Sequence, residues 1–336
     1  MRRPSRLAVP LLAVALAAGV SACGSSDDPS GSSGAAVGAA GGAFPVSIEN
    51  RFGTTAVESA PERVVTVGFN DLDFVLALGI IPVGTRANLG YDATQRPWVD
   101  AAARTALPTV GETEIDVEEV AALEPDLIVG VYSFLDQQTY DQLSAIAPTL
   151  AQTDEYADGA TPWQQQTLLT GRALGREDRA QDLVDDVEAR FAQARKDHPG
   201  FAGASVAVDY TGVAGSDHYL MGADDLRSQF FTALGFTVPA ASTAVSNEQL
   251  DLLDQDLLIG GGYGPADAVA TDPLFTSLEA VQEDRTVYLG AYAGDLMGAL
   301  GYGSPLALPY LLDQVEPALG QATDGNPATK VQQPTA

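Results

Sequence analysis

Short runs of β-branched and aliphatic residues alternate with helical stretches over most of the chain. Residues 64–67 and 126–131 are typical of buried strands, and residues 71–78 and 116–123 beside them have the spacing of helices. Such alternation predicts an α/β fold whose strands are largely parallel. The same pattern predicts strands at residues 80–84, 205–209 and 286–289, and helices at residues 136–147, 163–174, 177–196, 225–234 and 305–319.

The helix predicted at residues 177–196 divides this pattern into two halves. Apolar residues recur along it every three or four positions, with charged residues on the opposite face. Twenty helical residues make a rod of ~30 Å, which suits a stiff connector as well as a surface helix of one domain. Residues 118–129 and 248–259, one segment in each half, align without gaps as helix–strand units. The sequence therefore predicts two similarly built lobes joined by a rigid helix.

The N-terminal residues have the layout of a secretory signal. Three arginines precede an apolar run at residues 7–18, which is too short to span a membrane, and small residues precede Cys23. Residues 20–23, Val-Ser-Ala-Cys, resemble the bacterial lipobox, which implies that a diacylglyceryl group is attached to the Cys23 thiol. A plain signal peptide with an incidental cysteine and a short membrane anchor are the alternatives. Residues 24–43 are a Gly/Ser/Ala tract that we expect to act as a flexible tether.

These features divide the chain into segments. We expect a signal peptide at residues 1–22, lipidated Cys23 with its tether at residues 23–43, an N-terminal α/β lobe at residues 44–175, a linker helix at residues 176–198, a C-terminal α/β lobe at residues 199–320 and a frayed tail at residues 321–336. The mature protein is expected on the extracytoplasmic face of the cell membrane, held there through its lipid anchor only.

The net charge of the chain limits the classes of partner that it can bind. Acidic residues number 45 against 17 basic ones, so the net charge is −28 at pH 7. Nucleic-acid binding needs clustered lysine and arginine, so we expect no nucleic-acid partner. Copies of so acidic a chain repel one another, which favours a monomer.

Residues for catalytic and metal sites are scarce. Cys23 is the only cysteine, and His198 and His218 are the only histidines, so we expect no intrachain disulfide, no metal site and no catalytic residues. The motif Gly-x-Ser-x-Gly is absent, and the glycine run at residues 260–264 lacks the lysine of a phosphate-binding loop. His218, expected in a surface loop, is the histidine best suited to act as a base. The sequence therefore predicts a binding protein rather than an enzyme.

Short segments of the chain occur in the same order as in a known family. They are Pro-Glu-Arg-Val-Val at residues 61–65, Ala-Leu-Gly-Ile-Ile-Pro-Val-Gly at 77–84, Leu-Glu-Pro-Asp-Leu-Ile-Val at 123–129, Pro-Trp at 162–163, Ala-Leu-Gly-Arg-Glu at 173–177 and Ser-Pro-Leu at 304–306. Over residues 44–319 the chain resembles the periplasmic-type binding proteins of siderophore, haem and cobalamin importers, and among them the iron-siderophore-binding lipoproteins. The resemblance implies the class III fold, in which two Rossmann-like lobes are joined by a rigid linker helix.

The resemblance also implies that the protein captures a ferric siderophore and delivers it to an ABC importer, made of a two-subunit permease and its ATPase. A siderophore already saturates its iron, so the protein needs aromatic faces, hydroxyl groups and arginine rather than a cofactor of its own. A haem or cobalamin receptor is the alternative within this class, with His218 or a tyrosine as axial ligand of haem. A surface lipoprotein that binds a protein partner is the alternative from another class.

Aromatic and arginine residues in predicted loops are the candidates for ligand contact. Tyr132 follows the strand at residues 126–131, where the resembling family has an aromatic residue, and Tyr263 follows a glycine run. Trp163 is expected to be a core residue at the start of a helix. The small number of candidate arginines favours a hydroxamate ligand over a highly charged tricatecholate. The candidates are Arg86, Tyr91, Trp98 and Tyr132 in the first lobe, and Tyr210, Tyr219, Arg227 and Tyr263 in the second.

Glu118 and Glu248 occupy the same position in the two aligned helix–strand units. An acidic residue in a first helical turn is stabilised by the helix dipole, which explains each glutamate without any partner. The resemblance implies a further role, because in that family one glutamate on each lobe docks against arginines of the two permease subunits. We therefore expect Glu118 and Glu248 to be the permease-docking residues.

Overall fold

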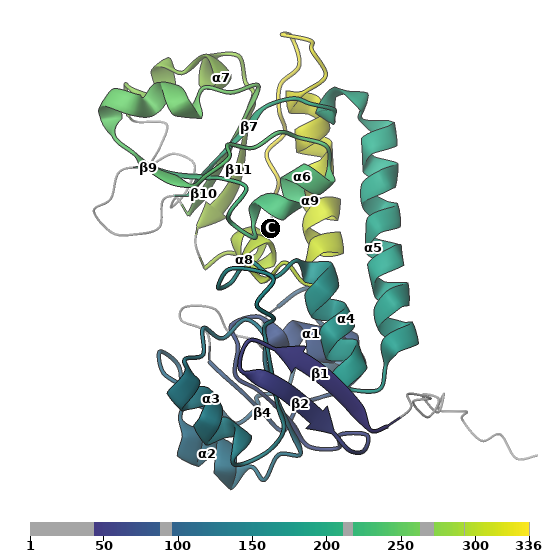
Figure 1. Ribbon diagram of the computed structural model, residues 1–336. Helices are drawn as coiled ribbons and strands as arrows, with labels where there is room; N and C mark the ends of the chain where they lie inside the picture. Colours follow the sequence, from purple (N-terminus) through teal and green to yellow (C-terminus); the bar gives the residue numbers. More distant parts are fainter. Residues whose placement is uncertain (1–43, 88–95, 211–217, 263–271, 292, 336) are drawn as a thin grey trace, which may run out of the picture. The chain divides into compact units, whose positions relative to one another are not determined.

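The computed structural model describes residues 44–87, 96–210, 218–262, 272–291 and 293–335 (Figure 1). Cys23, Tyr91 and Tyr263 lie outside these ranges. Two large sheets organise the described residues, one in each half of the chain. Within the described ranges, no helix combines the length and the apolar character needed to cross a membrane.

The sheet of the first lobe has four parallel strands. In spatial order they are β4 (Gly84–Thr85), β3 (Val64–Thr66), β5 (Leu127–Gly130) and β6 (Thr149–Ala151). Alternate residues enter separate cores: Val64 and Val129 pack on one face, and Val65 and Ile128 pack on the other. The strand predicted at residues 80–84 begins only at Gly84, since Pro82 has no N–H for a ladder hydrogen bond.

The helices of the first lobe follow the prediction closely. Asp116 accepts hydrogen bonds from the backbone N–H groups of Glu118 and Glu119 at 3.0 and 3.1 Å, so it is the N-cap. Asp136 caps the next helix through the N–H of Thr139 at 2.7 Å. The helices of the first lobe are α1 (Asp71–Ala77), α2 (Val117–Ala122), which Asp116 caps, and α3 (Gln137–Ser144), which Asp136 caps.

An antiparallel hairpin that the sequence analysis did not predict opens the described chain. It consists of β1 (Val46–Asn50) and β2 (Gly53–Val57). Ile48 and Val57 are buried in the same core as Val64, so the hairpin covers one side of the first lobe.

The second sheet has five strands and mixed direction. In spatial order they are β11 (Thr286–Ala291), β10 (Leu257–Gly262), β7 (Val206–Tyr210), β8 (His218–Met221) and β9 (Thr243–Val245). β10 pairs in parallel with β7 and β11, whereas β8 and β9 are antiparallel additions. His218, expected in a surface loop, therefore lies on a strand. That expectation was wrong because β8 is only four residues long and its pairing with β7 is not visible in a local pattern.

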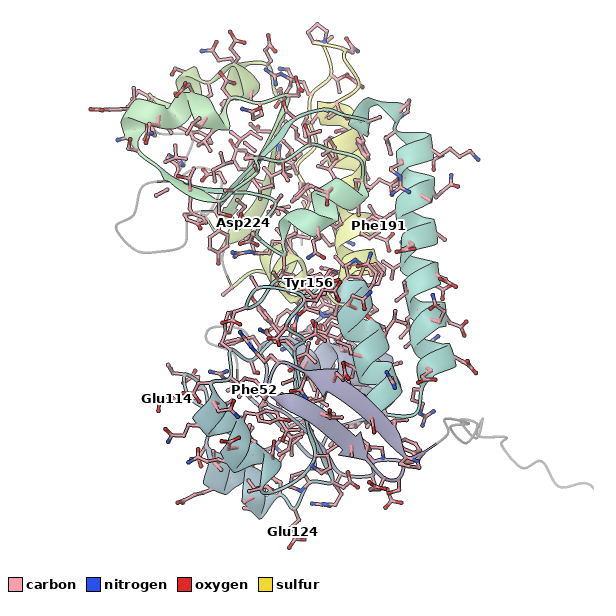
Figure 2. The ribbon with its side chains drawn as sticks, in the orientation of Figure 1. Phe52, Glu114, Glu124, Tyr156, Phe191 and Asp224 are labelled. Carbon is pink, nitrogen blue, oxygen red and sulfur yellow. The ribbon has the colours of Figure 1, made fainter. Side chains whose placement is uncertain are left out.

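Helix α5 (Glu177–Asp197) runs without interruption beside α4 (Trp163–Ala173). Its N-terminal residues Ala180 and Leu183 pack in the core of the first lobe. Phe191, farther along the helix (Figure 2), packs in the core of the second lobe. Its ring centroid lies 5.6 Å from that of Phe230. One continuous helix thus contributes to both cores.

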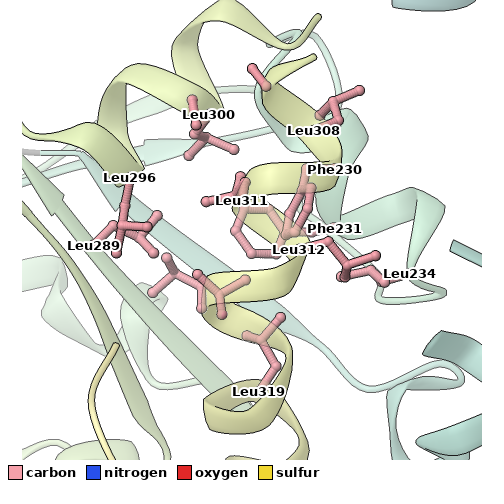
Figure 3. Close-up of a cluster of buried hydrophobic side chains, with 14 of the residues drawn as sticks. Phe230, Phe231, Leu234, Leu289, Leu296, Leu300, Leu308, Leu311, Leu312 and Leu319 are labelled. Carbon is pink, nitrogen blue, oxygen red and sulfur yellow. The ribbon is translucent and has the colours of Figure 1, made fainter. Parts of the chain in front are cut away.

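The core of the second lobe gathers around α9 (Ala307–Ala322) (Figure 3). Leu311 and Leu312 of α9 lie close to Phe230 and Phe231 of α6 (Ser228–Ala233) in this cluster. Leu296 and Leu300 come from α8 (Asp295–Tyr302). The remaining short helices are η2 (Ala101–Ala103), η3 (Pro199–Phe201), η4 (Asn247–Leu253), η6 (Phe275–Ser277) and α7 (Glu279–Gln282).

The C-terminal segment, expected to fray, packs along the edge strand β11 as far as it is described. The Gln333 side chain accepts from the N–H of Tyr288 at 2.8 Å and donates to the carbonyl of Thr286 at 2.9 Å. The N–H of Val331 donates to Asp284 at 3.2 Å. The amide of Gln333 thereby satisfies backbone groups that an edge strand leaves open, which polar composition alone did not reveal.

Candidate functional site

Three aromatic side chains meet where the parallel strands of the first lobe end. Phe69 follows β3, and Tyr132 and Phe134 follow β5. The ring centroids of Phe69 and Tyr132 are 6.0 Å apart, those of Phe69 and Phe134 5.9 Å, and those of Tyr132 and Phe134 5.3 Å. We call these residues the first-lobe aromatic cluster. The carboxyl ends of strands are where open α/β sheets bind ligands.

Phe134 was missed in the sequence analysis. Its side chain is 51% exposed, although its ring packs on Tyr132 and Phe69. Its backbone has φ 56°, the left-handed region that bulky residues avoid. Such strain persists only where the surrounding structure imposes it, and it is common at ligand-binding sites. The sequence feature that could have identified Phe134 is its position two residues after Tyr132, directly behind the same strand.

Gly159 is required by the close packing of this cluster. Its φ is +75°, and a Cβ there would lie 2.6 Å from Cε2 of Tyr132 and 3.0 Å from Cζ of Phe134. The chain therefore passes against the edges of two rings, which restricts where Tyr132 and Phe134 can move.

Arg86, at the end of β4, is buried next to the cluster. Its guanidinium lies 4.1 Å from the ring centroid of Phe69, a cation–π contact. It donates to the backbone carbonyl of Glu112 at 2.9 Å and to that of Thr113. Burial lowers the pKa of Arg86. Among the described residues, no carboxylate forms an ion pair with it.

Two of the predicted second-lobe residues contact each other. The guanidinium of Arg227 lies 4.5 Å from the ring centroid of Tyr210, which ends β7. Arg227 also makes a bidentate pair with Asp225, with Nε–Oδ1 2.8 Å and Nη2–Oδ2 2.5 Å. Burial alone would lower the pKa of Arg227, but the hydrogen bonds and charge of Asp225 outweigh it and raise the pKa. The second-lobe arginine is thus already neutralised by a carboxylate.

The electrostatics of Arg227 also link the two lobes. Tyr132 in the first lobe and Tyr210 in the second both favour the charged form of Arg227 and so raise its pKa. Such an influence requires Tyr132 and Arg227 to be near one another. The structure therefore brings predicted residues of both lobes into one neighbourhood: Tyr132, Tyr210 and Arg227, with Arg86 beside the aromatic cluster.

Trp98 and Trp163 are both buried. Trp98 Nε1 donates to Oδ2 of Asp73 at 2.7 Å, and its ring packs against Tyr302 and Tyr310 with centroids 5.9 and 5.5 Å away. Trp163 is 4% exposed in the same hydrophobic cluster, as predicted for a core residue. Trp98, predicted to lie in a loop at the ligand, thus packs in the interior where the lobes meet.

Tyr219 and His218 lie on β8 around a buried carboxylate. Asp209, on β7, accepts from the N–H of Tyr219 at 3.2 Å, and its Oδ2 is 2.5 Å from Nδ1 of His218. The His218 ring stacks on Phe275, with centroids 5.5 Å apart. The Tyr219 side chain is 38% exposed. In the parts of the chain that the structure describes, no three His, Cys, Asp or Glu side chains gather as a metal site would require.

Glu118 and Glu248 are both exposed. Glu118 lies in the first turn of α2, as predicted. Glu248 lies in η4, a 3₁₀ helix interrupted by non-helical backbone at Gln249, so the expectation of a matching α-helix was wrong. The sequence match between the two units reflects a similar pattern of buried apolar residues, Val120 and Leu127 in the first and Leu250 and Leu257 in the second, rather than identical helix geometry.

Comparison with known proteins places the chain among binding proteins. The sequence profile described as periplasmic binding protein matches residues 73–293. The Fe(3+)-citrate-binding protein YfmC of Bacillus subtilis is 28% identical over 252 residues, which cover 71% of this chain and 76% of that protein. The ferric enterobactin-binding periplasmic protein FepB of Escherichia coli is 27% identical over 273 residues, covering 74% and 84%.

Solved structures share the fold over most of its length. A periplasmic solute binding protein from Mycobacterium smegmatis superposes with a TM-score of 0.74 at 32% identity, covering 83% of this chain and 99% of that one. PiaA of Streptococcus pneumoniae in complex with ferrichrome superposes with a TM-score of 0.68 at 24% identity, covering 83% and 98%. These similarities confirm the predicted class III fold of two α/β lobes joined by a helix. From its lobes, its continuous helix α5 and a profile match over two thirds of its length, we conclude that the chain belongs to the periplasmic binding protein family.

Proposed function

We propose that this protein is an extracytoplasmic substrate-binding lipoprotein that captures a ferric siderophore and delivers it to an ABC importer. The observation that carries the proposal is the first-lobe aromatic cluster beside buried Arg86, with Tyr210 and Arg227 of the second lobe nearby. The relatives named for binding ferric citrate and ferric enterobactin, and the neighbour solved with ferrichrome, support this substrate class.

The chemistry of these residues suits a ligand that brings its own iron. Aromatic faces cover the organic shell of the complex, and tyrosine hydroxyls donate hydrogen bonds to its oxygens. Arg86 supplies a positive charge toward an oxygen-rich, electron-rich ligand. The iron remains bound by the siderophore, so the protein contributes neither a cofactor nor metal ligands, and its task is binding rather than catalysis.

The charge balance favours a ligand with little negative charge. Arg227 is paired with Asp225, and the single charge of Arg86 is accompanied by the buried carboxylate of Asp71 beside the same cluster, so the described residues leave little positive charge for a ligand. A ferric tricatecholate carries several negative charges, and burying them without matching cations is costly. A neutral ferric hydroxamate avoids that cost, and we therefore propose a hydroxamate-type siderophore.

The site of action follows from the N-terminal sequence. We propose that residues 1–22 are removed as a signal peptide and that Cys23 carries the lipid. Residues 23–43 then form the tether, and residues 44–175 and 199–320 form the two lobes. Residues 176–198 link the lobes, and residues 321–336 form a tail. The relatives that are named as lipoproteins support this arrangement. The protein then acts as a monomer on the extracytoplasmic face of the cell membrane, without nucleic-acid partners.

Delivery requires contact with the permease. Glu118 and Glu248 are exposed, one in each half of the chain, and each begins the segment that leads to a central strand of its sheet. Exposed charges at the rim of an interface mainly govern encounter and register. We propose that these two glutamates bind basic residues on the two permease subunits.

A fluorescence titration of the full chain tests the substrate. Ferrichrome and ferrioxamine B should quench the protein's fluorescence with saturation at one equivalent, whereas the iron-free compounds should not. Ferric citrate, ferric enterobactin, haem and cobalamin serve as competitors. Tight binding of haem or cobalamin alone would replace the proposed ligand class, and binding of ferric enterobactin without any hydroxamate would overturn the charge argument. A protein partner captured while none of these ligands binds would favour a non-transport lipoprotein.

A further inference from the structure

Asp71, the first residue of α1, is fully buried between the segments that carry the aromatic cluster. Its Oδ1 accepts a hydrogen bond from the backbone N–H of Tyr132 at 3.4 Å and another from Nε2 of Gln166 at 2.6 Å. Its Oδ2 makes no hydrogen bond of normal length and angle within the described chain. The backbone N–H groups of Gly68 and Val131 still approach the carboxylate closely enough to favour its charged form. One side chain thus contacts the ends of both β3 and β5.

The same two segments are joined through their backbones. The N–H of Phe69 donates to the carbonyl oxygen of Tyr132 at 2.9 Å. A Cβ at Gly68 would lie 2.0 Å from Oδ2 of Asp71 and 2.8 Å from the carbonyl oxygen of Tyr132. Only glycine fits, because the carboxylate and the backbone of Tyr132 pack directly against it. Tyr132 is therefore fixed at its N–H by Asp71 and at its carbonyl by Phe69.

Gln166 of α4 fixes the carboxylate from the other side. Its Nε2 also donates to Oδ1 of Asn70 at 2.8 Å, and Nδ2 of Asn70 donates to the carbonyl of Tyr302 in the second lobe at 3.0 Å. Asn70, Asp71 and Gln166 are all buried. The position of the Asp71 carboxylate is thus determined by α4 and by a network that reaches the second lobe.

We propose that Asp71 is a positioning residue, whose ionised carboxylate holds the backbone of Tyr132 and thereby the first-lobe aromatic cluster in its ligand-receiving arrangement. That the cluster receives a ligand rests on the proposed function; the positioning itself does not. A carboxylate accepts more N–H hydrogen bonds than a neutral carboxyl group, so protonation of Asp71 loosens Tyr132. Among the described residues, the titratable and charged side chains on the neighbouring segments are Arg86 after β4, Tyr132 after β5 and Asp73 on α1, whereas α4 presents the neutral Gln166.

Amide hydrogen exchange of the full chain without ligand tests the positioning. Asp71→Asn should lower the protection of the Gly68, Val131 and Tyr132 amides about tenfold, because hydrogen bonds to a charged group are stronger than those to a neutral one. The wild-type chain offers the same test without substitution. Burial raises the pKa of Asp71 to about 6, so protection of these amides against local openings that leave Asp71 buried, corrected for intrinsic exchange, should fall as the pH is lowered through about 6.

Asp126→Asn is the matched control. Asp126 also accepts hydrogen bonds from two backbone N–H groups, those of Glu62 and Arg63 at 2.8 and 2.9 Å, but just before β5 rather than after it. This variant should leave the exchange of the Tyr132 amide and its pH profile unchanged. Unchanged protection of Tyr132 in Asp71→Asn, or equal effects of the two variants on it, would overturn the proposal.

Ferrichrome titration separates this inference from the proposed function. Asp71→Asn should bind ferrichrome about tenfold more weakly than wild type at pH 7.5, whereas Asp126→Asn should bind it equally well. If wild type binds no ferric complex while Tyr132 exchange still responds to Asp71, the positioning stands and the proposed function fails. If wild type binds ferrichrome and Asp71→Asn binds it equally tightly, the positioning role in binding is refuted.

Discussion

The hydroxyl of Ser304 donates a hydrogen bond to Oδ2 of Asp73 at 3.1 Å, although the two residues are 231 positions apart in the sequence. The same carboxylate accepts from Nε1 of Trp98 and forms a fully buried ion pair with Arg96, whose guanidinium lies 3.9 Å from the ring centroid of Tyr302. Asp73 belongs to α1 in the first lobe, and Ser304 lies between α8 and α9 in the second. One carboxylate thus joins elements of both lobes.

Removing this carboxylate should cost much of the protein's stability. Asp73→Ala removes the buried carboxylate that pairs with Arg96 and accepts hydrogen bonds from Trp98 and Ser304, so the free energy of unfolding should fall by ~3–5 kcal/mol. Urea denaturation followed by circular dichroism measures the change. Asp313→Ala is the control, because the Arg190–Asp313 pair is exposed and should contribute ~1 kcal/mol or less. Equal losses in the two variants would contradict the assignment.

Asp71 should make stability depend on pH in an unusual direction. Burial raises its pKa from 3.8 to about 6, against hydrogen bonds from Tyr132 and Gln166 that lower it. Between these values the folded chain binds one proton more than the unfolded chain, so this residue's contribution to the free energy of unfolding decreases as the pH rises. The total change is about 3 kcal/mol, at 1.36 kcal/mol per pKa unit.

The comparison of wild type with Asp71→Asn isolates this contribution, since all other carboxyl groups are shared. The advantage of wild type over the variant should shrink by up to about 3 kcal/mol between pH 4 and pH 7. Urea denaturation at several pH values measures it. A difference that stays constant over this range would show that Asp71 has an ordinary pKa in the folded state.

Phe134 should matter for ligand binding more than for folding. Phe134→Ala removes the exposed ring of the cluster and should weaken ferrichrome binding about fivefold, roughly the value of one aromatic contact. The free energy of unfolding should change by about 1 kcal/mol or less, because the side chain is half exposed. Ile81→Ala removes a similarly exposed side chain elsewhere in the first lobe and should leave affinity unchanged. Undiminished affinity in Phe134→Ala would remove this residue from the binding surface.

The docking glutamates should affect transport without affecting ligand affinity. We expect Glu118→Arg combined with Glu248→Arg to lower siderophore uptake and stimulation of the importer's ATPase in reconstituted vesicles, because like charges then face the permease. Glu119→Arg combined with Asp251→Arg changes charge equally on the same two elements and should transport nearly normally. Normal transport by the first double variant would refute the docking assignment. Loss of ligand affinity would instead assign these glutamates to the fold or the binding surface.

Cys23→Ser should abolish lipidation, since a serine hydroxyl cannot form the thioether to diacylglycerol. Metabolic labelling with palmitate and membrane fractionation measure the loss. The affinity of the Cys23→Ser protein for ferrichrome should equal that of wild type, because the Gly/Ser tract separates Cys23 from the folded residues. Palmitate labelling that persists in the variant would show that Cys23 is not the anchor.

Local pattern determined the architecture of this protein to a large extent. The apolar spacing of residues 177–196 predicted α5. Asp116 and Asp136 indicated the starts of α2 and α3, because an N-cap bonds backbone N–H groups only two or three positions away. Most of the parallel strands of each lobe were visible as continuous apolar runs, since such strands are buried on both faces, whereas β6 was not predicted. The sequence also indicated Tyr132 and Tyr210 as candidates for ligand contact, since residues that directly follow strands lie at the edge where open α/β sheets bind ligands.

Contacts between residues that are far apart in the sequence became visible only in the tertiary structure. Only the fold shows that Trp98 is bound to Asp73 and packed against Tyr302, that Asp225 neutralises Arg227, and that β8 and β9 add to the second sheet. The exposure of Phe134 and the burial of Asp71 were likewise invisible in the sequence. Periodicity reports which side of an element is buried, whereas a hydrogen bond between residues 231 positions apart depends on how complete elements pack. Hence the sequence predicted most of the elements and the residue types at the ends of the strands, and packing alone determined which of these side chains meet one another and which hold the lobes together.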